Sequence, residues 1–320
     1  MSLFKKLELT EVHTYSVRER DSQVAIASLS RPHAPQSRFR DFIGNLPNLL
    51  KAVDLALLVD LMVQARQQDK PVALLMGAHV IKVGLNPIII DAMENGIITS
   101  VAINGAGSIH DTELAYFGAT SENVAEGLET GLFGMAAETA AIINETIHRG
   151  ADSNKGFGEL MGDRLLLDHP PHGATSLLAN AIQLRIPVTV HVALGTDIVH
   201  QHPNVDAAAI GTASYLDFKV FAQQLTALRP GAVVLLFGSA VLLPEVFLKA
   251  LTVVRNLGYP AREFITANFD MISHYRPRVN VLQRPTQNGG RYFEFIGHHE
   301  IMIPLLFAAV KEKLDESRGR

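Results

Sequence analysis

Residues able to carry protons gather in two short stretches of the sequence, each directly after an apolar run. They are His79 and Lys82 in the first stretch and His110, Asp111 and Glu113 in the second. Imidazole and carboxylate groups act as general acids and bases, and a desolvated lysine can form an imine with a carbonyl compound. The two stretches therefore predict an acid–base site with these five residues as candidate catalytic groups. A purely structural role is the alternative for each one taken alone.

Small or polar residues follow the predicted strands in the same way. They are Gly77 and Ala78, Asn104, Gly105, Ala106 and Gly107, Asp197, Gly238, Ser239 and Ala240, and Asp270. Glycines allow backbone N–H groups to approach a pyrophosphate, and carboxylates such as Asp111, Asp197 or Asp270 can hold ribose hydroxyls. This pattern favours a nucleotide or dinucleotide site. The full GxGxxG pattern is absent, so tight strand-to-helix turns remain the alternative for these glycines.

Further histidines suggest a metal site as a competing interpretation. They are His169 and His172, His200 and His202 close to Asp197, and His298 and His299 beside Glu300. Imidazole and carboxylate ligands suit zinc, iron or manganese. No spacing such as HExxH is present, so the prediction names no metal ligand.

The elements that must position these residues alternate regularly. Short apolar runs predict strands over 71–76, 97–103, 187–193, 232–237, 262–268 and 292–296. Helical patterns lie between them, over 46–66, 85–95, 133–148, 177–184, 244–257 and 301–314, with a helix start at 120–122. Ser214 and Asp217 resemble a capping box that opens a further helix ending at Pro230. Strands that are apolar along their whole length are covered on both faces, as in a parallel sheet.

The predicted fold class is therefore α/β, a doubly wound and mostly parallel sheet with helices on both faces. The prediction places an N-terminal arm with short elements over residues 1–45 and one α/β domain over residues 46–320. No internal repeat or low-complexity linker divides that domain.

Composition narrows the possible functions. The 320 residues include no cysteine and no tryptophan, which excludes disulfides, cysteine-ligated metal and a cysteine nucleophile. The 28 basic and 32 acidic residues give a net charge of −4 without a clustered basic stripe, so no nucleic-acid partner is expected. No apolar run reaches the roughly 20 residues of a membrane span, and the N-terminus is charged where a signal peptide is apolar. A cytoplasmic protein without a membrane partner is expected.

Several blocks resemble deoxyhypusine synthase over residues 70–310, among them "PGAVVLLFGSAVLLPEVFLKA" and "REFITANFD". The resemblance implies an NAD-binding, Rossmann-like domain in a homotetramer with active sites between subunits. By position it also places Gly77, Asn104, Asp197 and Gly238 with their neighbouring turn residues at NAD. Ala267 and Asn268, after Thr266, would lie near the adenosine.

The resemblance has one marked departure. Deoxyhypusine synthase uses a lysine in a late Trp-Gly-Lys motif, whereas the corresponding run here, "YRPRVNVLQRPTQNGGRYFEF", contains neither tryptophan nor lysine. A true deoxyhypusine synthase activity is therefore not expected.

The runs "GAHVIKVG" and "AGSIHDTE" look closer to the NAD-dependent ornithine cyclodeaminase domain (LOR/SDH type). That similarity implies a site lined by His79, Lys82, Asn104, His110, Asp111 and Glu113. Both families oxidise an amine with NAD. We therefore expect an NAD-dependent enzyme acting on a small amine or amino acid, with an imine as the immediate product. A metal-dependent hydrolase and a non-catalytic NAD-binding oligomer are the alternatives.

Overall fold

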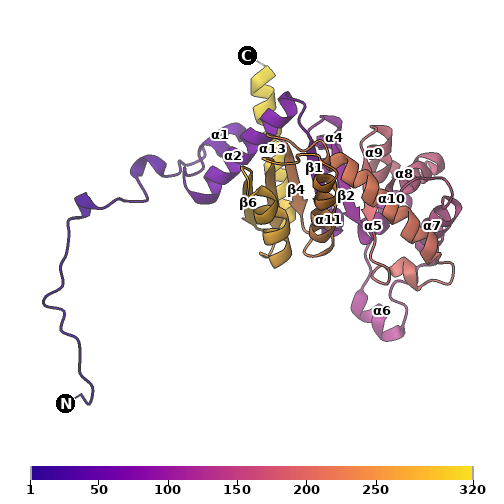
Figure 1. The fold of residues 1–320 in the computed structure, drawn as a ribbon, viewed down its shortest axis with the longest axis horizontal. Coiled ribbons are helices and arrows are strands. Elements are labelled where there is room, and N and C mark those ends of the chain that lie inside the picture. Colours follow the sequence, from indigo (N-terminus) through magenta and orange to yellow (C-terminus); the bar gives the residue numbers. More distant parts are fainter. Residues whose placement is uncertain (1, 319–320) are drawn as a thin grey trace. The chain divides into compact units, whose positions relative to one another are not determined.

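In the described part of the chain, six strands form one sheet in the order β3-β2-β1-β4-β5-β6, and all of them run parallel (Figure 1). The strands are β1 (Val72–Met76), β2 (Ser100–Asn104), β3 (Val188–His191), β4 (Val233–Phe237), β5 (Ile265–Asp270) and β6 (Arg291–Ile296). Every residue of β1, β3, β4 and β5 is buried. The predicted parallel sheet and α/β class are confirmed.

Helices connect the strands and cover both faces of this sheet. They are α2 (Leu50–Gln67), α3 (His79–Lys82), α4 (Asn86–Glu94), α5 (Gly105–Phe117), α6 (Val124–Thr130), α7 (Ala137–Arg149), α8 (Phe157–Asp168), α9 (Leu177–Gln183), α10 (Ala207–Leu225), α11 (Leu242–Asn256), α12 (Arg284–Thr286) and α13 (His299–Arg318). A π-helix, η5 (Pro277–Gln283), and two 3-10 turns, η3 (Gly173–Thr175) and η4 (Ile198–Gln201), complete this part of the chain.

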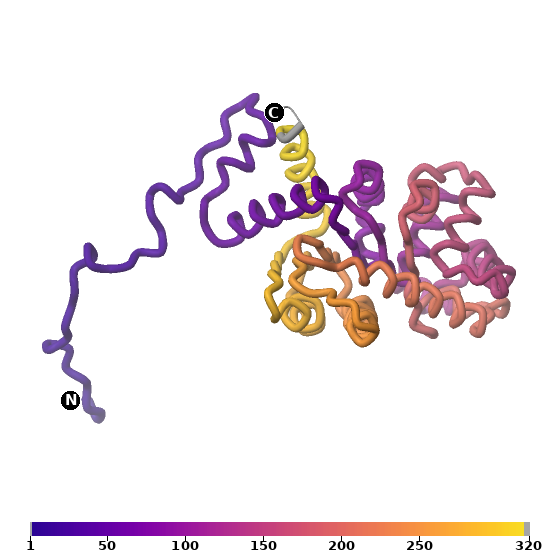
Figure 2. Tube along the Cα trace, turned by 45° about the horizontal axis from the view of Figure 1, so that its top comes forward, coloured from indigo at the N-terminus to yellow at the C-terminus, as the bar shows by residue number. Residues whose placement is uncertain are grey.

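The main hydrophobic core lies between the sheet and α10, α11 and η5. Leu75 and Leu236 point from the sheet into this core, where they join Phe247 of α11. On the other face, Phe237 of β4 meets Phe307 of α13 with 6.3 Å between ring centroids. In Figure 2, α7, α8 and α9 gather at the β3 end of the sheet, away from β6.

The helix predicted to start at Ser214 begins seven residues earlier, so the capping-box prediction is wrong. Asp206 is the N-cap of α10, and its carboxylate accepts the N–H of Ala209 at 2.9 Å. Ser214 and Asp217 lie inside α10 and bind the exposed edge of β3. The N–H of Val190 donates to Asp217 at 2.6 Å, and the N–H of Val192 donates to Ser214 at 3.0 Å. These polar residues cover a sheet edge that has no neighbouring strand.

Other boundaries move for local reasons. The helix predicted from Leu46 begins at Leu50. Pro47 disfavours helical geometry at Leu46, the residue before it. The strand predicted over 262–268 is β5, which extends to Asp270. Helices α5 and α8 were not predicted. The run 104–113 was interpreted as a polar turn because small and polar residues dominate its start.

The structure describes residues 2–318, and these divide into two units, the first ending at Val53 and the second beginning at Asp54. The first unit holds η1 (Val17–Glu19), η2 (Ile26–Ser28) and α1 (Phe39–Gly44), and none of its described residues is buried. The second unit holds the sheet. Among the described residues, no helix has both the length and the apolar character needed to span a bilayer.

Candidate functional site

The strand order reverses between β1 and β4, and the carboxyl ends of these two strands are unusually close. The N–H of Gly77, just after β1, donates to the carbonyl of Phe237 at 2.9 Å. A Cβ atom on Gly77 would lie 2.1 Å from the carbonyl oxygen of Gly238. Only glycine fits at this junction. In open α/β sheets such a reversal point opens the crevice in which ligands bind.

Backbone donors at this junction are available to a ligand. Within the described chain, the N–H groups of Ala78, Ser239 and Ala240 have no hydrogen-bond acceptor. These three residues precede the first turns of α3 and α11, where the helix dipole favours an anion. The turn therefore fits the phosphates of a dinucleotide, although Gly77 itself serves the close approach of the two strands and Gly238 leaves room for the ring of His299.

Two histidines lie next to each other beside this junction. The rings of His79 and His299 are 5.5 Å apart, edge to face. His299 is buried, and its Nε2 donates to the carbonyl of Phe269 at 3.1 Å. Burial lowers the pKa of His79, and the neighbouring His299 lowers it further. His79 is therefore held neutral near pH 7. Asp270, at the end of β5, is also buried.

A cavity of about 670 Å³ lies at the same edge of the sheet, beside α5. One face of α5 forms a wall of it, with the side chains of Ala106, Ile109, His110, Glu113 and Phe117. The remaining lining residues are Lys82, Ala119, Thr120, Ser121, Glu122, Val124, Phe133, Ala136, Glu138, Thr139, Thr196, Asp197 and Ile198. This volume is typical of a small-molecule site.

The N-terminus of α5 is already occupied by the chain's own polar groups. Asn104 caps the helix by accepting the N–H of Gly107 at 3.0 Å, and Asp197 accepts the N–H of Ala106. A Cβ atom on Gly105 would lie 1.9 Å from Asp197 Oδ2. The turn 104–107 therefore does not fit a cofactor phosphate. Burial raises the pKa of Asp197 to about 6, against the opposing effect of its hydrogen bonds.

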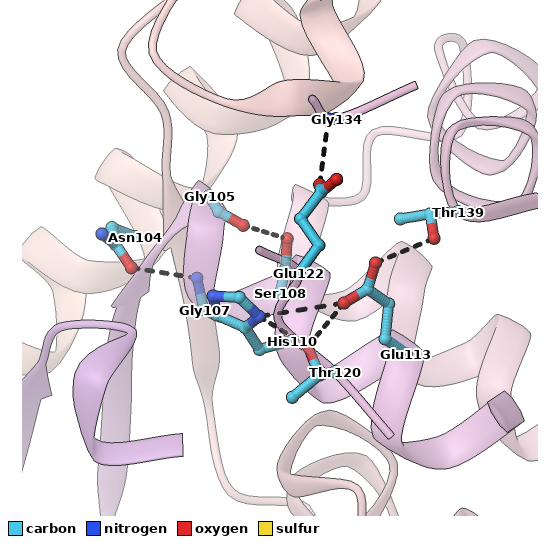
Figure 3. Close-up of polar contacts among 10 residues, drawn as sticks. All are labelled: Asn104, Gly105, Gly107, Ser108, His110, Glu113, Thr120, Glu122, Gly134 and Thr139. Carbon is cyan, nitrogen blue, oxygen red and sulfur yellow. Dashed lines mark hydrogen bonds and ion pairs between the residues drawn. The ribbon is translucent and has the colours of Figure 1, made fainter. Parts of the chain in front are cut away.

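A connected set of hydrogen bonds lines the cavity around Glu113 (Figure 3). Thr120 donates to Glu113 Oε2 at 2.5 Å, and Thr139 donates to Oε1 at 2.9 Å. His110 Nδ1 lies 2.7 Å from the Thr120 hydroxyl oxygen. Burial acts to raise the pKa of Glu113, but the neighbouring His110 and the hydrogen bonds from Thr120 and Thr139 outweigh it and lower the pKa. Glu113 is therefore an anion at neutral pH.

Residues 118–136, here named the flap, supply the opposite wall of the cavity and include α6. Gly118 at its start and Gly134 near its end are left-handed, with φ of 70° and 75°. Glu122 accepts the N–H of Gly134 at 2.9 Å, and His202 Nε2 donates to the carbonyl of Gly134 at 2.8 Å. The flap therefore has one hydrogen bond within itself and one to His202, in the loop after η4.

The structure brings some of the predicted residues to the cavity and not others. Lys82, Ala106, His110, Glu113 and Asp197 line it. His79 lies instead at the β1–β4 junction, together with Gly77, Ala78, Gly238, Ser239 and Ala240. Lys82 is the single lysine among the described cavity-lining residues, and it comes from α3 rather than from the late run in which deoxyhypusine synthase carries its lysine.

Asp111, which the sequence predicted as a catalytic residue, points into the protein interior and does not line the cavity. It is fully buried and accepts hydrogen bonds from Asn86 Nδ2, the Ser176 hydroxyl, and the N–H groups of Leu177 and Leu178, at 2.6–3.1 Å. Asp111 follows His110 on the helix, and successive helix residues face different directions. Its carboxylate joins α5 to α4 and to the start of α9.

Ala267 and Asn268, which were predicted to lie near the cofactor, are residues of β5. Both are fully buried inside β5, because the strand continues for two residues beyond its predicted end. They do not form a turn at the sheet edge, and only Asp270 reaches that edge.

The histidine clusters separate in the folded chain. In residues 2–318, no three His, Asp or Glu side chains are placed to hold a metal ion. His200 instead accepts the N–H groups of Gly195 and Asp197, at 3.1 and 3.3 Å. His169 ends α8 in a left-handed conformation.

Sequence reasoning missed the polar residues of the flap and of α7. Thr120 and Glu122 were interpreted as a helix start, whereas α6 begins at Val124 and their side chains bind Glu113 and Gly134. Thr139 and Glu138 lie in the first turn of α7. No local pattern marks these residues, because their partners are 7 to 26 positions away.

Comparison with solved structures shows which known proteins share this fold. AgrE in complex with ornithine and NAD+ matches 82% of this chain and 33% of its own, with a TM-score of 0.53 and 12% identity. Unliganded AgrE matches the same shares, with a TM-score of 0.52 and 13% identity. A candidate deoxyhypusine synthase from Entamoeba histolytica matches 86% of this chain and 93% of its own, with a TM-score of 0.52 and 9% identity.

The chain thus shares its fold with AgrE and with the deoxyhypusine synthase candidate. It spans about a third of the length of AgrE. No protein-family model and no curated protein sequence matches the chain.

Proposed function

We propose that this protein is an NAD-dependent enzyme that oxidises a small amine or amino acid to an imine. The observation that best supports this function is the negative charge of the cavity lining. Glu113, Glu122, Glu138 and Asp197 line it, against one lysine and one histidine. A surplus of carboxylates in a partly enclosed cavity favours a cationic ligand. Ile109, Phe117, Val124, Phe133 and Ile198 provide apolar walls for an alkyl portion.

The β1–β4 junction is the proposed cofactor site. The free N–H groups of Ala78, Ser239 and Ala240 would hold the phosphates. Short α3 links this junction to the cavity, since it begins at His79 and ends at the cavity-lining Lys82. When bound, NAD would accept a hydride from the carbon that bears the nitrogen. AgrE, which was solved with ornithine and NAD+, supports a cofactor of this type on this fold.

The chain's own residues handle the charge and the proton. An ammonium group has no lone pair, so it must lose a proton before its carbon can give up a hydride. His110 is the proposed base for that proton, and anionic Glu113 stabilises the resulting imidazolium. The carboxylates of Glu122, Glu138 and Asp197 would orient the substrate cation. The flap limits access of water to the imine.

Cofactor binding is tested by thermal unfolding with millimolar NAD. A ligand at 100 times its Kd stabilises a protein by about 2.7 kcal/mol, so a clear rise in Tm is expected. Ala240→Asp would place a carboxylate at the phosphate position and abolish the rise. Ala208→Asp, an exposed position at the start of α10, is the matched control and should retain it. Absence of any Tm change in the unmodified protein would refute NAD binding.

Catalysis is tested separately with a panel of diamines, ornithine and related amino acids. Reduced cofactor is followed by absorbance, and products by mass spectrometry, because a returned hydride leaves no net reduction. His110→Gln should lose product formation while retaining the Tm rise with NAD. Binding of NAD without product from any amine would favour the non-catalytic alternative.

The assembly and location remain proposals as well. By resemblance, we propose a homo-oligomer, a tetramer, that acts in the cytoplasm. Light scattering coupled to size-exclusion chromatography tests the proposed oligomer. A monomer at micromolar concentration would exclude the tetramer.

A further inference from the structure

The hydrogen bonds that join His110, Thr120 and Glu113 all run from donor to acceptor in one direction. The Thr120 hydroxyl determines that direction. A threonine hydroxyl has a single proton and can also accept. The Thr120 oxygen lies 2.5 Å from Glu113 Oε2 and 2.7 Å from His110 Nδ1. An ionised carboxylate only accepts, so the hydroxyl proton must point to Glu113. Nδ1 must therefore carry a hydrogen and donate it to Thr120.

This direction decides which nitrogen of a neutral His110 is basic. With the hydrogen on Nδ1, the lone pair is on Nε2. Figure 3 shows the second ring nitrogen on the side of the ring away from Thr120 and Glu113. Within the described residues no protein group bonds to it, and His110 lines the cavity. Nε2 is thus the nitrogen available to a ligand.

Glu113 is itself fixed in place on both oxygens. Thr139, from α7, donates to Oε1 and leaves Oε2 to Thr120. His110 and Glu113 are three residues apart on α5 and therefore share one face of the helix. The direct distance from His110 Nδ1 to Glu113 Oε2 is 3.8 Å, too long for a hydrogen bond. The threonine hydroxyl bridges this gap.

We propose that Thr120 is a positioning residue that holds His110 in the Nδ1–H tautomer. Its hydroxyl accepts the hydrogen of Nδ1 and donates its own to Glu113, so that Nε2 faces the ligand as the base. This role of Thr120 adds detail to the proposed function. It rests on that function only for the identity of the group that gives its proton to Nε2, the substrate ammonium. Thr120 belongs to the flap, whereas His110 and Glu113 belong to α5. The base is therefore correctly set only when the flap is in the position seen here.

The tautomer can be measured without cofactor or substrate. Long-range 1H–15N NMR spectra of histidine-labelled protein distinguish a protonated from an unprotonated ring nitrogen, and His110→Gln identifies the His110 signals. In the unmodified protein at a pH where His110 is neutral, Nδ1 should be protonated and Nε2 unprotonated. The opposite tautomer would overturn the proposal.

Variants separate positioning from general structural effects. Thr120→Val removes the acceptor for Nδ1–H and should shift His110 toward the Nε2–H tautomer, while Thr120→Ser should retain Nδ1–H. Glu113→Ala frees the Thr120 proton to point at Nδ1 and should shift the tautomer in the same direction as Thr120→Val. Thr139→Val, which touches Glu113 but not His110, is the matched control. Unfolding midpoints of all variants establish that they fold.

An unchanged tautomer in Thr120→Val would overturn the relay. Because these spectra contain no NAD, failure of NAD binding would leave them unaffected. A failed relay with intact amine oxidation would in turn leave the proposed function standing.

Discussion

At the scale of single residues, glycines in this protein make room for the protein's own atoms. Gly77 permits two strands to meet, and Gly105 permits Asp197 to reach the start of α5. The sequence predicted both glycines as possible phosphate contacts. A glycine after a strand occurs at phosphate sites and also where parts of the chain pack closely. Only the atoms around each glycine in the folded protein distinguish these two roles.

Gly105→Ala should therefore destabilise the fold. The added Cβ would overlap Asp197 Oδ2, and overpacking of this kind costs about 1–3 kcal/mol. Gly211→Ala is the matched control, since it is exposed in α10 with nothing within 4 Å of the new atom. It should be neutral or stabilising by about 0.5–1 kcal/mol. Chemical unfolding measures both, and equal stability of the two variants would contradict the packing argument.

Asp197 should give the protein's stability a distinct pH dependence. Its pKa rises from 3.8 to about 6 on folding because the carboxyl group is buried. Between those values the folded chain holds a proton that the unfolded chain has lost. The contribution of Asp197 is thus fully present below pH 3.8 and is lost as the pH rises toward 6.

The comparison with Asp197→Asn isolates this effect. The variant cannot ionise, so the difference in unfolding free energy between the two proteins should change across that pH window. Urea titrations at several pH values measure it. A constant difference would show that Asp197 has the same pKa in both states.

At the scale of elements, several helices are held by polar side chains that are remote in sequence. Asp111 of α5 caps the start of α9 and binds α4 through Asn86. Asp217 of α10 binds the edge of β3 and the N–H of Gly158 at the start of α8. Both aspartates have the residue type of a catalytic group, yet their bonds are structural.

Asp111→Ala should consequently impair folding rather than only chemistry. Four donors would lose their acceptor in the interior, and the unfolding free energy should fall by about 3 kcal/mol or more. Asp152→Ala, an exposed aspartate, is the control and should change little. Should Asp111→Ala retain full stability, the capping role assigned to Asp111 would be wrong.

At the scale of the whole molecule, the buried residues all belong to the second unit. Every core side chain lies at Leu55 or beyond. We therefore propose that residues 46–320 fold without residues 1–45. A chain truncated to 46–320 should show one cooperative thermal transition and native circular dichroism. Aggregation or loss of the transition would contradict this boundary.

The sequence by itself determined the class of this protein. Fully apolar strands alternating with helices can be buried only in a parallel sheet covered on both sides, and the small turns after the strands indicated the sheet edge at which the candidate site lies. The local runs "GAHVIKVG" and "AGSIHDTE" were enough to place His79, Lys82, His110 and Glu113 at that edge.

Only the tertiary structure decided what each of these residues does. It turned Asp111 inward, separated His79 from His110, and brought Thr120 and Thr139 to Glu113. The physical reason is that helix phase and long-range hydrogen bonding, rather than residue type, set the direction of a side chain. A shift of one residue along α5 separates the buried capping residue Asp111 from the cavity-lining His110.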